Sequence, residues 1–237
     1  ESLRAQSQRP ALKLLNKDDL ADPDATRAWL AHYNAQPGVK AIALAANKPR
    51  EVARVPREAA ALAPGHGTAR KPLRMMILGI PNVGKSTLMN ALLQRRIAKV
   101  GDEPAITKIN MEHKLGDGMW LIDTPGFLWP GLNQQVATKL AATHSIGRNA
   151  YDEQTVAIAL GEYLLVRYPV QLAGRYGALP DSSDGHRLLT TIAERRSLTA
   201  KRGEPDLQRA ALVLLNDFRS GILGRITLET VDGAAGP

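Results

Sequence analysis

Cysteine is absent from this chain of 237 residues, so the sequence has neither a disulfide framework nor a metal site built on thiolates. This absence fits a reducing compartment. The chain has no run of eighteen or more apolar residues, which predicts no membrane span, and no stretch of it resembles a signal peptide. Aromatic residues make up only 4% and are not interleaved with the basic residues, so the pattern does not indicate base stacking.

Apolar residues and positive charge are well represented. Hydrophobic residues make up 44%, enough for one large domain or two modest ones. The formal net charge is +8, and its excess lies in the first half: residues 1 to 127 carry 19 basic against 12 acidic residues, and the remainder carries 12 against 11. Such a face can meet nucleic-acid phosphates or can simply be solvated surface. The basic residues cluster at Lys48, Arg50, Arg54, Arg57, Arg70, Lys71 and Arg74, and again at Arg95, Arg96, Lys99, Lys108 and Lys114.

The first hundred residues predict strands that alternate with helices. Residues 11–15 and 39–45 are short apolar runs, and between them residues 22–35 read as a helix that Asp22 caps and Pro23 opens. Strand, helix and strand in this order form the unit of a parallel sheet covered by helices.

The pattern continues after a basic connection at residues 49–72. Residues 73–80 predict a buried strand and 86–94 a helix, and two further strands, near 109–115 and 119–123, flank a turn at 116–118 that suits a hairpin. Beyond Pro130 the periodicity is helical only. The apolar faces of these helices are Val156, Leu160, Tyr163 and Leu164; Leu188, Leu189, Ile192 and Ala193; and Leu207, Ala210, Ala211, Leu214, Leu215 and Phe218. The sequence therefore predicts an α/β domain over residues 1–131 and a small helical domain over 132–237.

A phosphate-binding loop is the strongest motif. The stretch GIPNVGKST, residues 79–87, matches G-x-x-x-x-G-K-[ST] and lies between a predicted strand and a predicted helix. Loop and helix N-terminal N–H groups, here those of Val83, Gly84, Lys85, Ser86 and Thr87, would wrap an anionic phosphate. Lys85 would reach the β- and γ-phosphates, and Ser86 would give its hydroxyl to Mg²⁺.

A second phosphate-sensing motif follows about forty residues later. In LIDTPG, Asp123 ends an apolar strand and would hold Mg²⁺, while the N–H of Gly126 would sense a γ-phosphate. Thr107 is the only threonine between the phosphate-loop helix and Asp123, which makes it the candidate switch residue for Mg²⁺ and γ-phosphate.

A guanine-recognition motif precedes the phosphate loop instead of following it. Residues 16–19 read N-K-D-D, where Asp19 would accept hydrogen bonds from guanine N1–H and the exocyclic amine, and Asn16 and Lys17 would brace the base and the phosphate loop. Ala45, Ala46 and Asn47 stand where GTPases carry a Ser-Ala-x loop whose backbone N–H meets guanine O6. Joining the ends of a domain and cutting it elsewhere gives this order. The sequence therefore predicts a P-loop GTPase domain with circularly permuted strand order.

Together these motifs resemble the YlqF/RbgA family of ribosome biogenesis GTPases. The resemblance rests on the guanine motif, GIPNVGKST, Thr107, DTPGFLWP and a helical domain that contains DFRSGILGRITLE, and it covers essentially the whole chain. It implies a bacterial cytoplasmic factor, with a mitochondrial relative as the other option, that binds GTP or GDP and assists late assembly of the large ribosomal subunit. It also implies contact with ribosomal RNA through both domains, in the helical domain through patches such as Arg195, Arg196, Lys201 and Arg202. We expect a monomer when free.

Two departures from the family pattern concern the switch loop and the first strand. Ala105 stands where the family usually has glycine, and five strands are present where six are expected, which predicts that the domain's first strand precedes Glu1.

The position after Gly126 is Phe127, which cannot polarise water as a glutamine does. Asn82 matches the loop asparagine that helps to bind K⁺ in related GTPases, so we expect catalysis to depend on Lys85, Asn82, Thr107 and Gly126, with K⁺ stimulation.

Other interpretations stay open at the level of sequence. His113 and His144 are weaker candidates for a catalytic group. The main alternative function is an RNA-binding scaffold with a vestigial guanine site. A metabolic P-loop ATPase or kinase is a second alternative, and a membrane-remodelling GTPase is disfavoured because no amphipathic lipid-binding helix stands out.

Overall fold

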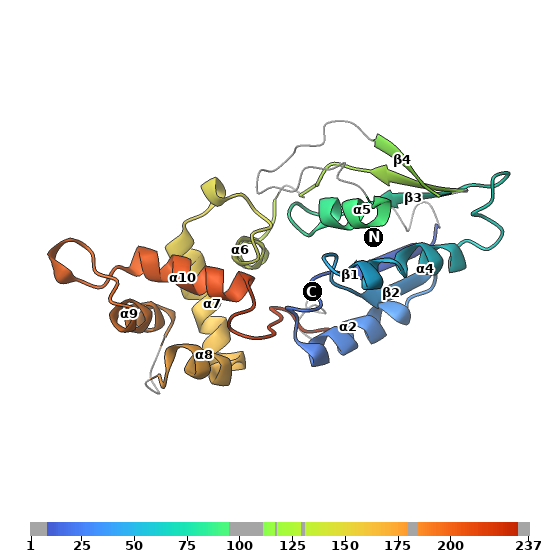
Figure 1. Cartoon of the computed structure of the whole chain (residues 1–237). Coiled ribbons are helices and arrows are strands. Elements are labelled where there is room, and N and C mark those ends of the chain that lie inside the picture. The colour runs from blue at the N-terminus through green and yellow to red at the C-terminus, as the bar shows by residue number, and fades with distance from the viewer. Residues whose placement is uncertain (1–8, 95–110, 117, 129–130, 180–183, 232–237) are drawn as a thin grey trace. The chain divides into compact units, whose positions relative to one another are not determined.

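The chain forms two compact units in a computed structural model, which describes residues 9–94, 111–116, 118–128, 131–179 and 184–231. The first unit comprises the residues up to Leu128 together with those from Glu229 on, and the second runs from Trp129 to Leu228 (Figure 1). The predicted boundary lay three residues later and assigned the whole C-terminal part to the helical domain. At the C-terminal side, the indole N–H of Trp29 in the first unit donates to the carbonyl of Glu229 at 3.2 Å.

The first unit begins with the predicted strand, helix and strand. β1 (Ala11–Leu15) and β2 (Val39–Ala43) pair in parallel, and α2 (Pro23–Asn34) connects them. The side chain of Asp22 accepts hydrogen bonds from two backbone N–H groups of the first turn, and Pro23 occupies that turn. These predictions are confirmed.

Two short helices occupy the segment that the sequence assigned to a connection. They are α3 (Pro49–Val52) and α4 (Val55–Ala61). Each has a proline in its first turn, which favours helix initiation, but neither is long enough to show an apolar period.

A second sheet carries the phosphate motifs. β3 (Leu73–Ile77) and β5 (Met119–Asp123) are parallel neighbours, and β4 (Met111–Gly116) pairs antiparallel with β5, so the order is β3-β5-β4. α5 (Lys85–Leu93) follows β3. The predicted hairpin is confirmed.

The prediction that residues 73–80 form a buried strand is wrong in part. Leu73 is buried, but Met76 is 54% and Leu78 57% exposed. Leu78 lies after the end of β3, and Met76 belongs to an end strand that has a strand neighbour on one side only.

A small apolar core joins one strand of the second sheet to both strands of the first sheet and to three helices. Its buried members are Ile42, Leu44, Ala46, Val52, Val55 and Leu88, and Leu12, Leu14, Ile77, Ala91 and Leu92 pack against them. Since these residues come from β1, β2, α3, α4, β3 and α5, the core brings the guanine-motif segment next to the phosphate-loop helix.

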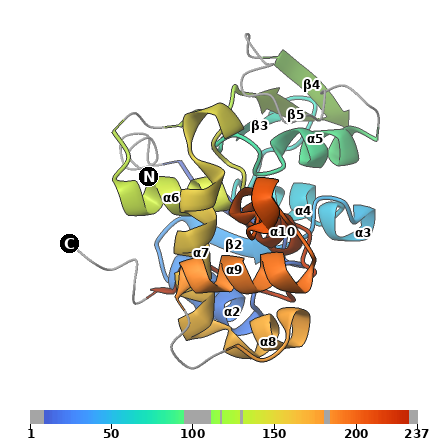
Figure 2. The same cartoon turned by 90° about the vertical axis from the view of Figure 1, so that its left-hand side faces the viewer.

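The second unit is helical, as predicted: α9 and α10 both pack against α7 and against each other, and Figure 2 shows α9 crossing α7. Its helices are α6 (Gln134–Ala142), α7 (Glu153–Arg167), α8 (Pro169–Tyr176), α9 (Gly185–Arg195) and α10 (Leu207–Arg219), with 3₁₀ turns at Arg148–Ala150 and Lys201–Gly203. The predicted apolar faces supply its core, in which Leu164, Leu188 and Leu214 are fully buried. No single described helix is long and apolar enough to cross a membrane; α7 and α8 reach that length and apolarity only as a pair, bent by 113°.

Candidate nucleotide-binding site

The phosphate loop connects β3 to α5, as the motif predicts. Gly84 caps α5 with a φ of 98°, and Asn82 also has a positive φ of 57°. Lys85 begins the helix, and Ser86 and Thr87 lie partly buried in its first turn. The N–H groups at such a helix start have no partner within the helix, so the loop offers donors to an anion.

Lys85 is folded back onto its own loop. Its Nζ donates to the carbonyl oxygens of Gly79 at 2.9 Å and Ile80 at 2.8 Å. Burial lowers the pKa of this amine, and the negative charge of Asp123 offsets part of that effect. A partly desolvated cation of this kind gains from a nearby anion.

The DTPG segment lies against the phosphate loop. Asp123 ends β5 opposite Ile77 in the register and is 6% exposed. A side chain on Gly126 would begin 3.0 Å from Nζ of Lys85, so the position has no free space for one. The N–H of Phe127 donates to the carbonyl of Gly79 at 3.3 Å, the same carbonyl that Lys85 uses.

Asn16 joins the guanine motif to the phosphate loop across 67 residues of sequence. Its Nδ2 donates to the carbonyl of Val83 at 2.7 Å, and its Oδ1 accepts from the N–H of Ala46 at 2.9 Å. A Cβ added to Gly84 would lie 2.2 Å from Nδ2 of Asn16, so the two segments are in direct contact. The motif that comes first in the chain therefore lies directly beside the phosphate loop.

The rest of the guanine motif forms a turn after β1. Lys17 is exposed and has a φ of 60°, and the N–H of Asp18 donates to the carbonyl of Leu44 at 3.2 Å. Asp19 is half-buried. The turn is thus tied to the end of β2, where the Ala45, Ala46 and Asn47 loop begins.

Glu51 is a site residue that the sequence did not reveal. Its Oε2 accepts from the N–H of Ala45 at 2.7 Å, and its Oε1 lies 3.2 Å from Nζ of Lys48. The Ala45 N–H and then Lys48 lower the pKa of this carboxyl below its ordinary value. Glu51 thus holds a loop in which Ala45 replaces the usual serine. The sequence signal was Pro49 followed by an acid at the third helical position, typical of a helix start.

Several candidates do not come together at this site. Thr107 and Ala105 lie outside the described residues. His113 is 8% exposed within β4, and His144 follows α6 in the second unit with a φ of 63°. Of the helical-unit patch, Arg195 and Lys201 are exposed and Arg196 is about one third exposed.

The donors present suit a hard cation bound with phosphate. Among the described residues no three histidine, cysteine or acidic side chains are grouped as a metal cage. The buried carboxylate of Asp123 and the hydroxyl of Ser86 are oxygen donors, and Mg²⁺ favours one or two protein oxygens plus nucleotide phosphates over an all-protein cage.

Comparison with known families and curated proteins points to ribosome-associated GTPases. A family model described as "50S ribosome-binding GTPase" matches residues 74–160, a range that includes the phosphate motifs but not Asn16. The chain is 35% identical to ribosome biogenesis GTPase A of Priestia megaterium over 97% of this chain and 82% of that protein. It is 30% identical to mitochondrial ribosome-associated GTPase 1 of Bos taurus over 93% and 74% of the two chains.

Solved structures agree with this grouping. A GDP-bound structure of TM YlqF is 25% identical, with a TM-score of 0.67 over 95% of this chain and 86% of that one. A GNP-bound crystal structure of YlqF from T. maritima gives a TM-score of 0.61 at the same identity, over 92% and 81%.

Proposed function

The chain belongs to the ribosome biogenesis GTPase A family, a group of GTP-hydrolysing P-loop enzymes, and on this premise we propose that it is a GTP-driven switch in late assembly of the large ribosomal subunit. The observation that carries this proposal is the bridge from Asn16 to Val83 and Ala46, which couples base recognition to the phosphate loop. The family description "50S ribosome-binding GTPase" supports the choice of subunit. In this function GTP is cleaved to GDP and phosphate.

Guanine recognition falls to Asp19 and the loop after β2. Asp19 accepts from the base N1–H and its exocyclic amine, which adenine does not offer in this arrangement. Within the loop, the N–H groups of Ala45 and Ala46 already donate to Glu51 and Asn16, while that of Asn47 has no acceptor among the described residues. We therefore assign the contact with guanine O6 to the N–H of Asn47, with Lys17 covering the base.

Asp19→Asn tests this assignment. The variant should bind GDP more weakly and favour xanthosine diphosphate, because the amide donates where the carboxylate accepted. A P-loop enzyme for ATP would be unaffected by the change. Unchanged GDP affinity with no gain for the xanthosine nucleotide contradicts guanine recognition by Asp19.

Phosphate binding and charge stabilisation fall to the phosphate loop and DTPG. Lys85 exchanges its two loop carbonyls for β- and γ-phosphate oxygens, while the N–H groups from Val83 to Thr87 surround the β-phosphate. Ser86, Asp123 and Thr107 would hold Mg²⁺, which neutralises charge on the phosphates when bound. The N–H of Gly126 senses the γ-phosphate.

Hydrolysis needs a group other than a glutamine. Phe127 is 62% exposed and apolar, so it cannot orient water by hydrogen bonding. We assign part of the charge stabilisation to K⁺ at Asn82, whose side chain lies on the phosphate loop. Turnover measured in K⁺ should exceed that in Na⁺, and Asn82→Ala should remove the difference; equal rates in both salts for both proteins contradict the role of K⁺.

The proposed partner is large-subunit ribosomal RNA, which the basic first unit and arginines of the helical unit would contact. In this proposal the protein is a monomer and acts in the bacterial cytoplasm. Sedimentation with mature and immature subunits tests this. We expect co-sedimentation with immature large subunits in a non-hydrolysable GTP analogue and release in GDP. A protein that stays in the supernatant under every condition contradicts the proposal.

A further inference from the structure

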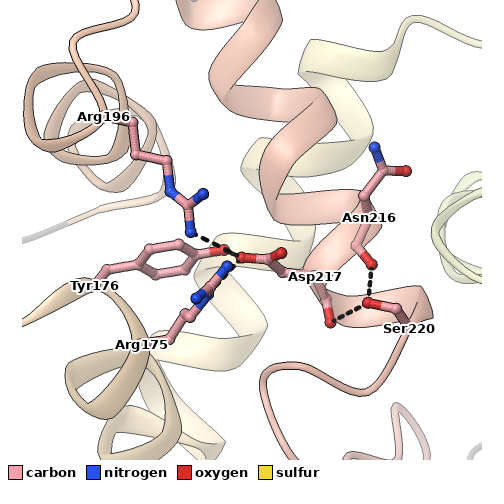
Figure 3. A network of polar contacts seen from close by, with 6 residues as sticks. All are labelled: Arg175, Tyr176, Arg196, Asn216, Asp217 and Ser220. Carbon is pink, nitrogen blue, oxygen red and sulfur yellow. Dashed lines mark hydrogen bonds and ion pairs between the residues drawn. The ribbon is translucent and has the colours of Figure 1, made fainter.

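One buried acid in the helical unit has no part in the GTPase site. Asp217, on α10, is 6% exposed, and three donors meet its Oδ2 (Figure 3). They are Nε of Arg175 at 2.7 Å, the hydroxyl of Tyr176 at 3.1 Å and Nη2 of Arg196 at 3.5 Å. Arg175 and Tyr176 end α8, and Arg196 caps the C-terminus of α9, so the acid gathers the ends of three helices.

The location is unfavourable for a carboxylate on its own. Asp217 lies in the last turn of α10, where the helix carbonyls already make the potential negative. Burial raises the pKa of Tyr176, so its hydroxyl remains a donor to the acid, and the hydrogen bond that Arg175 donates to Asp217 raises the pKa of Arg175. The cluster holds one negative and two positive side chains, which leaves a net charge of +1.

The two arginines keep most of their donors available. The side chain of Arg175 is 31% and that of Arg196 35% exposed. Each guanidinium donates to the carboxylate of Asp217 from one of its three nitrogens, and Arg175 also has a hydrogen-bond interaction with Tyr176. Next to them Arg195 is exposed and donates from Nη2 to the carbonyl of Ala178 at 2.8 Å. Three guanidinium groups therefore gather at the ends of α8 and α9.

We propose that Arg175 and Arg196 form a clamp for one phosphate of the RNA backbone, and that Asp217 is the positioning residue that aims them. The inference rests on the proposed function, because it locates the RNA contact of the helical unit. A guanidinium presents a planar fork of N–H donors that matches phosphate oxygens. Holding one nitrogen of each fork on a buried carboxylate fixes both planes before the phosphate arrives, which lowers the entropy lost on binding.

The substitution Asp217→Asn distinguishes the positioning role of the acid from the effect of net charge on RNA binding. The substitution removes a negative charge, so charge alone predicts tighter RNA binding. If the acid aims the two forks, the variant binds more weakly in spite of its higher net charge. We expect about a tenfold loss of affinity, the usual scale for a charge-assisted hydrogen bond.

Arg196→Gln tests the clamp with the smallest structural disturbance, because the 3.5 Å contact is the longest of the three. The control is Arg187→Gln, the same change on an exposed residue at the other end of α9. The probe is an in vitro transcript of bacterial large-subunit rRNA, bound by the full chain over a series of KCl concentrations. Arg196→Gln should lose about tenfold in affinity and about one unit of salt slope relative to the control.

The outcomes separate the clamp from its premise. Urea unfolding and GTPase turnover without RNA check that each variant is folded; if Asp217→Asn is not, Arg196→Gln decides alone. If Asp217→Asn lowers stability but binds RNA as tightly as the wild type, and Arg196→Gln matches Arg187→Gln, the cluster is an internal brace and the clamp is refuted. If the wild type binds no rRNA at all, the proposed function fails first.

Discussion

The contact between Asn16 and Gly84 can be measured by a double-mutant cycle in the nucleotide-free chain. Asn16→Ala removes two hydrogen bonds, to Val83 and from Ala46, each worth about 1 kcal/mol, so we expect a loss of about 1–3 kcal/mol. Gly84→Ala places a methyl group 2.2 Å from Nδ2 of Asn16 and forces alanine to a φ of 98°. The backbone part alone costs about 1–2 kcal/mol.

The cycle isolates the contact because the methyl group meets Nδ2 only when Asn16 is present. Gly84→Ala should therefore cost less in the Asn16→Ala background than in the wild type, by about 0.5–3 kcal/mol. The assay is urea unfolding of the four proteins without nucleotide, which keeps phosphate binding out of the comparison. Additive losses would show that the guanine motif and the phosphate loop do not touch, and the bridge on which the proposed function depends would be wrong.

Three further predictions concern the same unit. Glu51→Ala should speed GDP release about threefold to tenfold, as followed with a fluorescent GDP, whereas Lys48→Gln keeps the Ala45 hydrogen bond and should not. Because the pKa of Glu51 lies below its ordinary 4.5, the stabilisation of the loop by its carboxylate is fully present above pH 4.5 and is lost as the pH falls through the lowered pKa. Equal GDP release rates for the two variants would refute this role of Glu51. Gly118→Ala should lower the free energy of unfolding by about 1–3 kcal/mol more than Gly65→Ala. The two glycines have nearly the same φ, 79° at Gly118 and 81° at Gly65, but only at Gly118 would the added methyl group meet backbone, 2.4 Å from the carbonyl oxygen of Gly67. Equal melting temperatures for the two variants would refute this. Burial lowers the pKa of Lys85, and a bound phosphate should raise it again. GDP binding should therefore take up protons at a pH near the lowered pKa, and the affinity for GDP should fall as the pH rises through that pKa. Calorimetry in two buffers of different ionisation enthalpy that shows no proton uptake would contradict this.

Much of the first unit could be predicted because its elements carry their own local signals. Asp22 and Pro23 mark the start of α2, and the strand before Gly79 places the phosphate loop. The order of the guanine and phosphate motifs predicted a permuted domain, and the contact between Asn16 and Val83 is the structural counterpart of that order. Such features depend on neighbours in sequence or on a fixed motif, so one sequence suffices to find them.

Features that depend on distant partners could not be predicted. The exposure of Met76 follows from the position of β3 in its sheet, which an apolar run does not encode. Glu51 was missed because α3 has only four residues, too few for an apolar period. Asp217 sits in a helix whose apolar stripe was recognised, but its partners come from α8 and α9, and no spacing in the sequence links them.

The carbonyl of Gly79 connects nucleotide binding to the exit of the first unit. It accepts from Nζ of Lys85 and from the N–H of Phe127, and a carbonyl oxygen has two lone pairs for two such donors. If a bound phosphate draws Lys85 away, as proposed above, the oxygen keeps the Phe127 donor, and Gly126, which lies against the same amine, loses that neighbour. Leu128 is the last residue of the unit in this direction, so this change would occur within two residues of the chain that enters the helical unit. The permuted order makes this possible, because it places DTPG at the end of the domain instead of in its middle.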